Sequence, residues 1–311
     1  MRFPTRHRGA AVVLPLLATL SSGAAQSEVN IVPVEVRRPS SSEVNNQLFV
    51  DVTVCNAQQQ CQTVPDVLVD TGSSGLRLFR PALQGLDLDA VTVLDKRPMA
   101  LWERFGSGDL WGKLHWARVR IGGVETTETM PINVFDRSSP GEQLPAGYGG
   151  RDLRDEADGI AGNGILGISP QRYSRGRYFA FAGAHGTPSK FDWDRVKVKK
   201  SLQLANPIGH FPEPYNNGNV INLPEVDASS GQKTVQGWLG LGIGQPTEML
   251  FPEGSRVITH ELDQDSLFPV KLGERSLDVM LDSGATVIHL DLDISALRAT
   301  RFFRGFTTRQ R

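Results

Sequence analysis

The chain has almost no excess of charge of either sign. It has 33 basic and 34 acidic residues among 311, which gives a formal charge of −1. Nucleic-acid binding requires basic residues gathered on one surface, so this balance argues against a nucleic-acid partner. Long apolar runs are missing as well. The run over residues 10–20 is too short to cross a bilayer and no later run is long enough, so we expect no membrane span.

Cysteine is scarce, because Cys55 and Cys61 are the only two in the chain. A zinc site takes about four ligands, and two thiols without a nearby pair of histidines supply too few, so we expect no metal. The two cysteines flank residues 56–60, between strand-like runs at 48–54 and 62–69. In an exported chain this spacing favours a disulfide that closes the hairpin.

The first 25 residues have the three parts of a secretory signal peptide. Arg2, Arg6 and Arg8 precede the apolar run, and small residues at 21–25 follow it. We therefore predict cleavage near Ala25 and a mature protein in the periplasm or outside the cell. Export agrees with the expected disulfide.

Two copies of one short motif organise the mature chain. Each copy has apolar residues, an aspartate, a hydroxyl residue, a glycine and a small residue: Val69, Asp70, Thr71, Gly72 and Ser73 in the first, and Leu281, Asp282, Ser283, Gly284 and Ala285 in the second. One copy alone has the composition of an ordinary β-turn. Two copies, each preceded by a strand-like apolar run, favour a shared site that needs two carboxylates.

These motifs resemble the active-site motifs of the pepsin-like aspartic peptidases, in which two β-rich lobes each contribute one aspartate to a shared cleft. The resemblance implies an all-β, two-lobed β-barrel fold, with Asp70 and Asp282 as the catalytic residues and no cofactor. The supporting loop residues would be Thr71, Gly72, Ser73, Ser283 and Gly284. Two close carboxylates share one proton, as this family itself illustrates, so one can activate a water while the other protonates the leaving group.

A glycine-rich hairpin tip follows the first aspartate, consisting of Phe105, Gly106, Ser107 and Gly108. It is similar to the flap of pepsin-like enzymes, which closes over an extended peptide and excludes water. The resemblance therefore implies a peptide or protein substrate bound in an extended conformation under this flap.

Three positions depart from the family pattern. Phe105 stands where the family has a flap tyrosine, and Arg77 stands where it has the tryptophan to which that tyrosine bonds. Losing both leaves neither partner orphaned, but we expect it to remove a contact that steadies the flap. Ala285 replaces a hydroxyl that Ser73 keeps, so the two aspartates should lie in unlike surroundings. Thr71 and Ser283 keep the hydroxyls that, in the family, brace the two loops.

The remaining segments fit two lobes. Residues 158–168 resemble the segment that packs behind the first aspartate loop, with Gly167 allowing close approach of the backbone. Short apolar runs at 206–208, 219–224 and 238–244 predict strands of a second lobe. We therefore divide the chain into a signal peptide at 1–25, an N-terminal lobe at 26–200 and a C-terminal lobe at 201–311. Most of the mature chain also resembles a bacterial group of exported, functionally uncharacterised pepsin-like domains.

The end of the chain departs from a complete second lobe. After residue 295 it has no acidic residue and no strand-like alternation, and it contains the basic residues Arg298, Arg301, Arg304, Arg309 and Arg311. Since the family has further strands after the second aspartate, we expect the second lobe to be incomplete at its C-terminal end, through truncation or a shifted reading frame. A basic tail for an acidic partner is the alternative.

Two functions remain open. The first is an exported, monomeric aspartic endopeptidase in which Asp70 and Asp282 hold the attacking water. The second is a catalytically inactive pepsin-like module that binds peptides or components of the cell envelope. Both intact aspartates favour the enzyme, whereas the changes at Phe105, Arg77 and Ala285 favour the binding module. Glycoside hydrolysis also uses two carboxylates, but it does not call for duplicated Asp-hydroxyl-Gly turns.

Overall fold

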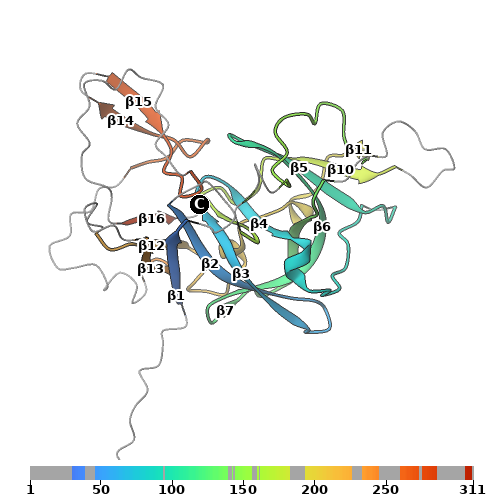
Figure 1. The fold of residues 1–311 in the computed structure, drawn as a ribbon, viewed down its shortest axis with the longest axis horizontal. Helices are drawn as coiled ribbons and strands as arrows, with labels where there is room; N and C mark the ends of the chain where they lie inside the picture. Colours follow the sequence, from blue (N-terminus) through green and yellow to red (C-terminus); the bar gives the residue numbers. More distant parts are fainter. Residues whose placement is uncertain are drawn as a thin grey trace, which may run out of the picture.

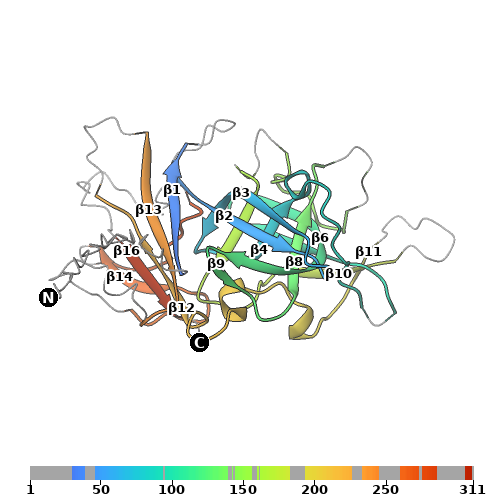
Figure 2. The same ribbon diagram turned by 90° about the horizontal axis from the view of Figure 1, so that it is seen from below.

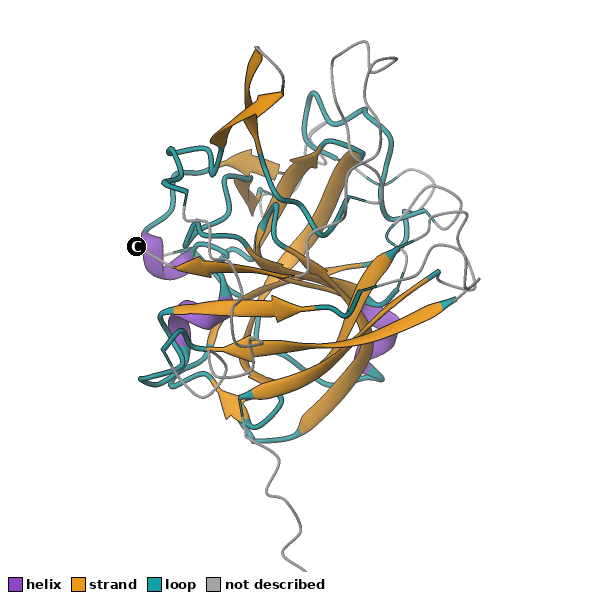
Figure 3. Ribbon diagram, turned by 90° about the vertical axis from the view of Figure 1, so that its left-hand side faces the viewer, coloured by secondary structure: helices purple, strands orange, loops and turns teal. Residues whose placement is uncertain are grey.

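The computed structural model of the protein consists mainly of β-strands, as Figure 3 shows, and confirms the predicted all-β class. It describes residues 30–38, 46–93, 95–138, 142, 144–155, 160, 162–182, 193–225, 233–244, 260–272, 275–285 and 305–309. The expected signal peptide and its cleavage site therefore lie outside the described residues, as do residues 158, 159 and 161 of the segment expected behind the first aspartate loop.

The strands and three short 3-10 helices follow one another along the chain (Figure 1). In order they are β1 (Ile31–Arg37), β2 (Gln47–Cys55), β3 (Cys61–Asp70), β4 (Ser74–Phe79), η1 (Arg80–Leu83), β5 (Met99–Phe105), β6 (Gly108–Ile121), β7 (Val124–Glu125), β8 (Met130–Phe135), β9 (Gly164–Ile168), β10 (Arg177–Phe181), β11 (Trp193–Arg195), η2 (Lys200–Leu202), η3 (Pro207–His210), β12 (Gly218–Asn222), β13 (Thr234–Leu241), β14 (Phe268–Leu272), β15 (Arg275–Val279) and β16 (Gly305–Arg309).

One 14-stranded sheet contains every described strand except β14 and β15. Its hydrogen-bonded order is β11-β10-β5-β6-β8-β4-β9-β3-β2-β1-β13-β12-β16, with β7 paired to β6 and a second pairing between β6 and β2. In Figure 2, β1, β12, β13 and β16 lie on one side of the molecule, and β4, β6, β8 and β10 lie on the other. The strand that ends at Asp70 is β3, which lies inside the sheet between β2 and β9.

The interior position of β3 explains its sequence. The last four residues of β3 are all buried, and they are Val67, Leu68, Val69 and Asp70. A strand covered on both faces has a continuous apolar run rather than an alternating one. Its parallel neighbour β9 is buried along its whole length and pairs Gly167 with Asp70. The sheet therefore carries an ionisable group into the protein core at the end of β3.

Gly167 has the packing role that the sequence predicted. A Cβ atom at this position would lie 2.8 Å from the backbone carbonyl group of Ser73, in the first aspartate loop. Real Cβ atoms do not approach backbone this closely, so only glycine lets β9 support the loop directly. The pairing of β9 with β4 agrees with this close approach, since Gly167 lies opposite Gly75 of β4.

The second aspartate is reached differently. The hairpin β14–β15 is a separate two-stranded sheet, which stands apart at the upper left of Figure 1. Its second strand ends at Val279, and the following residues 280–282 are not in a strand. Met280 is 39% exposed. The apolar run at 279–281 therefore belongs to a strand only at Val279, because it lacks the buried neighbours that surround β3.

Two of the three runs predicted as strands after residue 201 belong to β12 and β13, but the first does not. Residues 207–210 form η3, with Pro207 at the start and Asn206 as the N-cap, whose side chain accepts a hydrogen bond from the backbone N–H of Ile208 at 3.0 Å. Proline suits the first turn of a helix and asparagine suits its cap. These two residues outweigh the apolar content of the run.

The tail also contains a strand that its side-chain pattern did not indicate. Residues Gly305–Arg309 form β16, which pairs antiparallel with β12 from Gly218↔Arg309 to Asn222↔Gly305. The expectation of a tail without a strand is therefore wrong at these residues. An edge strand can form through backbone hydrogen bonds to a neighbour with free N–H and C=O groups, without an alternating sequence.

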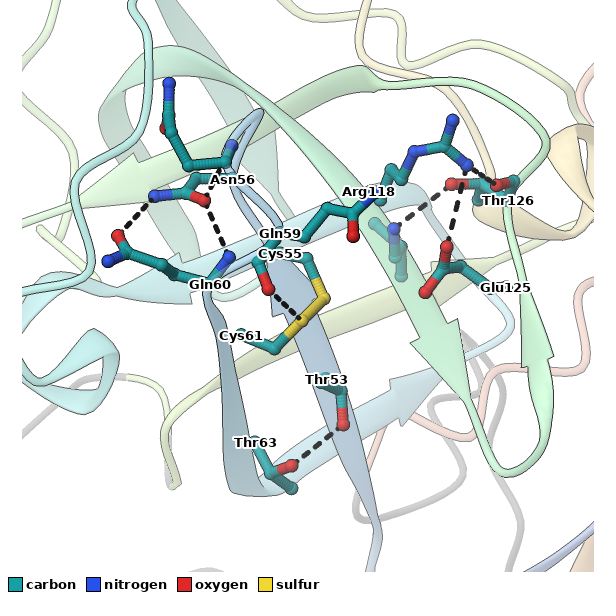
Figure 4. The surroundings of a disulfide bond; sticks show 12 residues. Thr53, Cys55, Asn56, Gln59, Gln60, Cys61, Thr63, Arg118, Glu125 and Thr126 are labelled. Atoms are coloured by element: carbon teal, nitrogen blue, oxygen red, sulfur yellow. Dashed lines mark hydrogen bonds and ion pairs between the residues drawn. A yellow bond between two sulfur atoms is a disulfide. The ribbon is translucent and has the colours of Figure 1, made fainter.

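The predicted disulfide is confirmed, and Figure 4 shows its surroundings. Cys55 ends β2 and Cys61 begins β3, and their Cα atoms are 4.0 Å apart. Between them, the side-chain oxygen of Asn56 accepts hydrogen bonds from the backbone N–H groups of Gln58 at 3.0 Å and Gln60 at 2.9 Å. The bond closes a turn that already has its own hydrogen bonds. Of the helices in the described ranges, none has the length and hydropathy of a membrane-crossing segment.

We predict that the disulfide stabilises this hairpin locally. The double substitution Cys55→Ser with Cys61→Ser should lower the free energy of unfolding by about 2 kcal/mol, because the closed loop is short. Urea denaturation measures the loss, and alkylation without reductant followed by mass spectrometry should find no free thiol in the parent protein. Two alkylated cysteines in native material would contradict the prediction.

Candidate active site

The first carboxylate is buried and held by its own turn. Asp70 is 5% exposed at the end of β3. One of its oxygens, Oδ1, accepts a hydrogen bond from the backbone N–H of Gly72 at 2.8 Å, and the hydroxyl of Ser73 donates to Oδ2. The chain reverses immediately after the strand, so the N–H and hydroxyl groups of the turn come back to the carboxylate. Hydrogen bonds of this kind reduce the cost of placing a carboxylate in the core.

The second carboxylate has a simpler and more open setting. Asp282 is exposed, and its Oδ1 accepts a hydrogen bond from the backbone N–H of Gly284 at 2.8 Å. Ala285, at the position equivalent to Ser73, has no hydroxyl to donate, and its backbone N–H bonds to the carbonyl of Asp282 at 3.3 Å. The unlike surroundings expected from the sequence are therefore present.

The two loops are joined by a reciprocal set of hydrogen bonds. The N–H of Thr71 donates to Ser283 Oγ at 3.1 Å, and the N–H of Ser283 donates to Thr71 Oγ1 at 3.0 Å. Each hydroxyl then donates onward across the junction, Thr71 to the carbonyl of Leu281 at 2.8 Å and Ser283 to the carbonyl of Val69 at 2.6 Å. Four bonds thus tie together two loops that are far apart in the sequence.

The loop glycines let each carboxylate face the opposite loop. A Cβ atom on Gly72 would lie 2.6 Å from Cγ of Asp282, and a Cβ atom on Gly284 would lie 2.9 Å from Oδ1 of Asp70. Any side chain at either position would collide with the carboxylate across the junction. The glycines are therefore required because the two acidic groups share one small space.

The two carboxylates interact directly enough to change protonation. The pKa of Asp70 is raised to about 7, first by burial and then by the negative charge of Asp282 and a hydrogen bond with it, against the lowering effect of the bonds from Ser73 and Gly72. Asp70 therefore keeps its proton over most of the acidic range. A pair with one proton combines a hydrogen-bond donor with a proton acceptor.

The predicted flap is a hairpin made by β5 and β6, with Phe105 paired to Gly108 and residues 106–107 at the tip. Phe105 packs against the cluster of Phe49, Leu68 and Ile165. Leu68 lies two residues before Asp70 on β3, so the two side chains share a face of the strand. The tip therefore lies on the side of the sheet that presents the first carboxylate.

The structure corrects one expectation about the flap. The guanidinium carbon of Arg77 lies 5.2 Å from the ring centroid of Phe105. The two departures from the family pattern therefore contact each other, and the flap has not lost its link to the strand after Asp70. The physical reason is that an aromatic face attracts a guanidinium group, so a cation–π contact takes the place of a hydrogen bond.

Sequence reasoning missed Glu103 and Ser174. Glu103 pairs with Arg77 at 3.0 Å, and the hydroxyl of Ser174 donates to the same carboxylate oxygen. The sequence signal that could have identified Glu103 was an acidic residue two positions before Phe105, on the same face of β5. Among the residues that the structure describes, no group of three or more His, Cys, Asp or Glu side chains could hold a metal ion.

Comparison with known proteins identifies a family but no activity. A family model described as "Protein of unknown function (DUF3443)" matches residues 26–303, which is most of the chain. No curated protein matches the chain.

We predict that Asp70 makes stability depend on pH. The pKa of this carboxyl rises from 3.8 in an unfolded chain to about 7 in the fold, so the folded state binds more protons between these values. The contribution of Asp70 to stability should therefore be largest below about pH 4, fall by roughly 3 to 4 kcal/mol up to about pH 7 and then level off, since each pKa unit corresponds to about 1.4 kcal/mol.

Denaturant unfolding at several pH values measures this slope. Asp70→Asn should lose most of it, because an amide stays neutral and Ser73 can turn its hydroxyl to accept from the amide. Asp136→Asn, which changes an exposed aspartate paired with Arg80, is the matched control and should keep the slope. Parallel profiles for the parent and Asp70→Asn would contradict the assignment.

Proposed function

Since the chain belongs to the DUF3443 family, whose description names no activity, we propose from its site that it is an aspartic endopeptidase of the pepsin-like type. The observation that carries the proposal is the four-bond junction of Thr71 and Ser283, which brings Asp70 and Asp282 to one space. Two carboxylates that share a proton suit the hydrolysis of an unactivated amide, because one can act as a base and the other as an acid.

The unequal surroundings suggest which carboxylate has which role. Asp70, buried and with a raised pKa, is the proton donor, and Asp282, exposed and negatively charged, is the proton acceptor. Asp282 takes a proton from a water as its oxygen attacks the peptide carbonyl carbon, and Asp70 gives its proton to the carbonyl oxygen. A tetrahedral diol results, with the pair still holding one proton.

Breakdown of the diol completes the hydrolysis. The proton now on Asp282 passes to the amide nitrogen as the carbon–nitrogen bond breaks, and Asp70 takes back a proton from one of the diol hydroxyls. The products are a carboxylic acid and an amine, and the pair returns to its starting state. Both steps need the two carboxylates in fixed positions, which the glycines and hydroxyls of the two loops supply.

The substrate is proposed to be an extended peptide under the β5–β6 hairpin. A Cβ atom on Gly106 would meet nothing within 4 Å, so the tip has open space beside it. Extended peptides bind hairpins and sheet edges through backbone hydrogen bonds. The other end of the tip is less free, because a Cβ atom on Gly108 would lie 2.3 Å from the carbonyl oxygen of Arg151.

The two-lobed pepsin-like architecture and export are part of the same proposal. The division seen in Figure 2, with β1, β12, β13 and β16 on one side, supports two lobes, and the pairing of β1 with β2 would join them. The disulfide supports an oxidising compartment. We propose a monomer that works outside the cytoplasm.

Incubating the protein with a denatured protein library from pH 3 to 8 tests the function. Cleavage should be strongest in acid and fall as the pH rises through about 7, where Asp70 loses its proton. Asp70→Asn and Asp282→Asn should each lower the rate by about 100-fold or more, the typical contribution of one general acid or base. Circular dichroism should show that both variants stay folded.

Asp136→Asn is the control and should cleave as the parent does. Full turnover in either active-site variant would refute the proposal, as would activity that depends on added metal. If the parent binds peptides through both aspartates without cleaving them, the chain is a binding module instead.

A further inference from the structure

We infer that Arg77 holds the flap in place over the first aspartate loop and thereby sets how tightly an extended peptide binds. The inference rests on the proposed function for its substrate, but the contacts themselves do not. In this account Arg77 is a positioning residue, because it acts through Phe105 and the hairpin tip and not on the reacting atoms.

The position of Arg77 is unusual for a charged residue. It lies in the middle of β4, which begins soon after Asp70, and its side chain is 0% exposed. An arginine almost never lies fully buried unless its charge is paired. One end of its guanidinium, Nη1, donates to the carbonyl of Gly75 at 3.1 Å, so the group is fixed to the start of its own strand, directly after the first aspartate loop.

The other end of the guanidinium reaches the flap. Nη2 donates to the carboxylate of Glu103 on β5 at 3.0 Å, and Glu103 is held in turn by the hydroxyl of Ser174. Two residues along β5, the ring of Phe105 lies 5.2 Å from the guanidinium carbon. Arg77 therefore links the start of β4, directly after the first aspartate loop, to both the strand and the tip of the flap.

Only arginine can make these three contacts together. A planar guanidinium donates in two directions within its plane and stacks through its face, whereas a lysine ammonium is a single point of charge. The Nε of Arg77 has no hydrogen-bond partner in the described part of the chain. The contacts that hold this buried side chain are therefore made by Nη1, by Nη2 and by the face of the guanidinium.

The neighbouring Arg104 provides a matched comparison. It also stacks on an aromatic ring of the hairpin, with its guanidinium carbon 5.3 Å from the ring of Trp102, and pairs with Asp109 at 2.8 Å. Its side chain is 60% exposed, and all of these contacts lie within the hairpin itself. Arg104 therefore has the same chemistry as Arg77 without a link to the aspartate loop.

The experiment compares Arg77→Lys, Phe105→Leu and their combination with the control Arg104→Lys. The first readout is hydrogen–deuterium exchange in residues 101–110, which does not depend on catalysis. Arg77→Lys and Phe105→Leu should each speed exchange there by about tenfold, because the tip opens locally without unfolding of the sheet. The double variant should add little to either single one, since both remove the same contact.

The second readout separates binding from chemistry. With a cleaved peptide, Arg77→Lys and Phe105→Leu should raise KM by about tenfold and change kcat little, because the carboxylates keep their positions. A peptide with a hydroxymethylene group in place of the scissile amide should bind more weakly to the same extent. Arg104→Lys should change exchange at residues 101–110, KM and affinity much less than Arg77→Lys does, because its side chain is exposed and its contacts stay within the hairpin.

The outcomes distinguish the two proposals. If the parent neither cleaves nor binds peptides, the proposed function fails, and the exchange data alone decide whether Arg77 fixes the flap. Unchanged exchange at residues 101–110 in both Arg77→Lys and Phe105→Leu would overturn the inference, as would equal effects of Arg104→Lys. If Arg77→Lys does not fold, Phe105→Leu decides, because it leaves the Arg77–Glu103 pair intact.

Discussion

The site depends on one interaction, the exchange of hydrogen bonds between Thr71 and Ser283. Each hydroxyl accepts from the backbone N–H of the opposite loop and donates to a carbonyl beyond it. A hydroxyl is the smallest side-chain group that can accept and donate at once, so both positions need serine or threonine. The two loops are brought together by this junction, and the glycines beside it leave the space that Asp70 and Asp282 share.

The hydrogen bonds of the junction are symmetric, but the strands that lead into the two loops are not. Asp70 ends a buried strand inside the large sheet, whereas Asp282 follows the separate hairpin β14–β15 and is exposed. Burial disfavours the charged form of a carboxylate, so this difference raises the pKa of Asp70. In the proposed mechanism this difference makes Asp70 the acid and Asp282 the base. Arg77 links the start of β4, directly after the first aspartate loop, to the flap.

Local signals explain how much could be predicted from the sequence. The disulfide hairpin and the buried strand before Asp70 follow from apolar runs, turn residues and spacing, whereas the all-β class and the close approach at Gly167 came from the resemblance to a known family. The Arg77–Phe105 contact could not be foreseen, because it depends on two strands meeting side by side. The helix η3 was missed because an N-cap outweighed an apolar run, and β16 because an edge strand is selected by its neighbour's free backbone groups.

The most direct test of this account is a double-mutant cycle on the junction, with Thr71→Val, Ser283→Ala and both together. Thr71→Val keeps the shape of the side chain, so the cycle reports the hydroxyl contacts rather than packing. If the loops are held as described, the second substitution should lower the free energy of unfolding by at least about 1 kcal/mol less in the presence of the first than it does alone. The reason is that the first substitution has already separated the loops. A loss of unfolding free energy in the double variant that equals the sum of the two single losses to within about 0.3 kcal/mol would contradict the shared site.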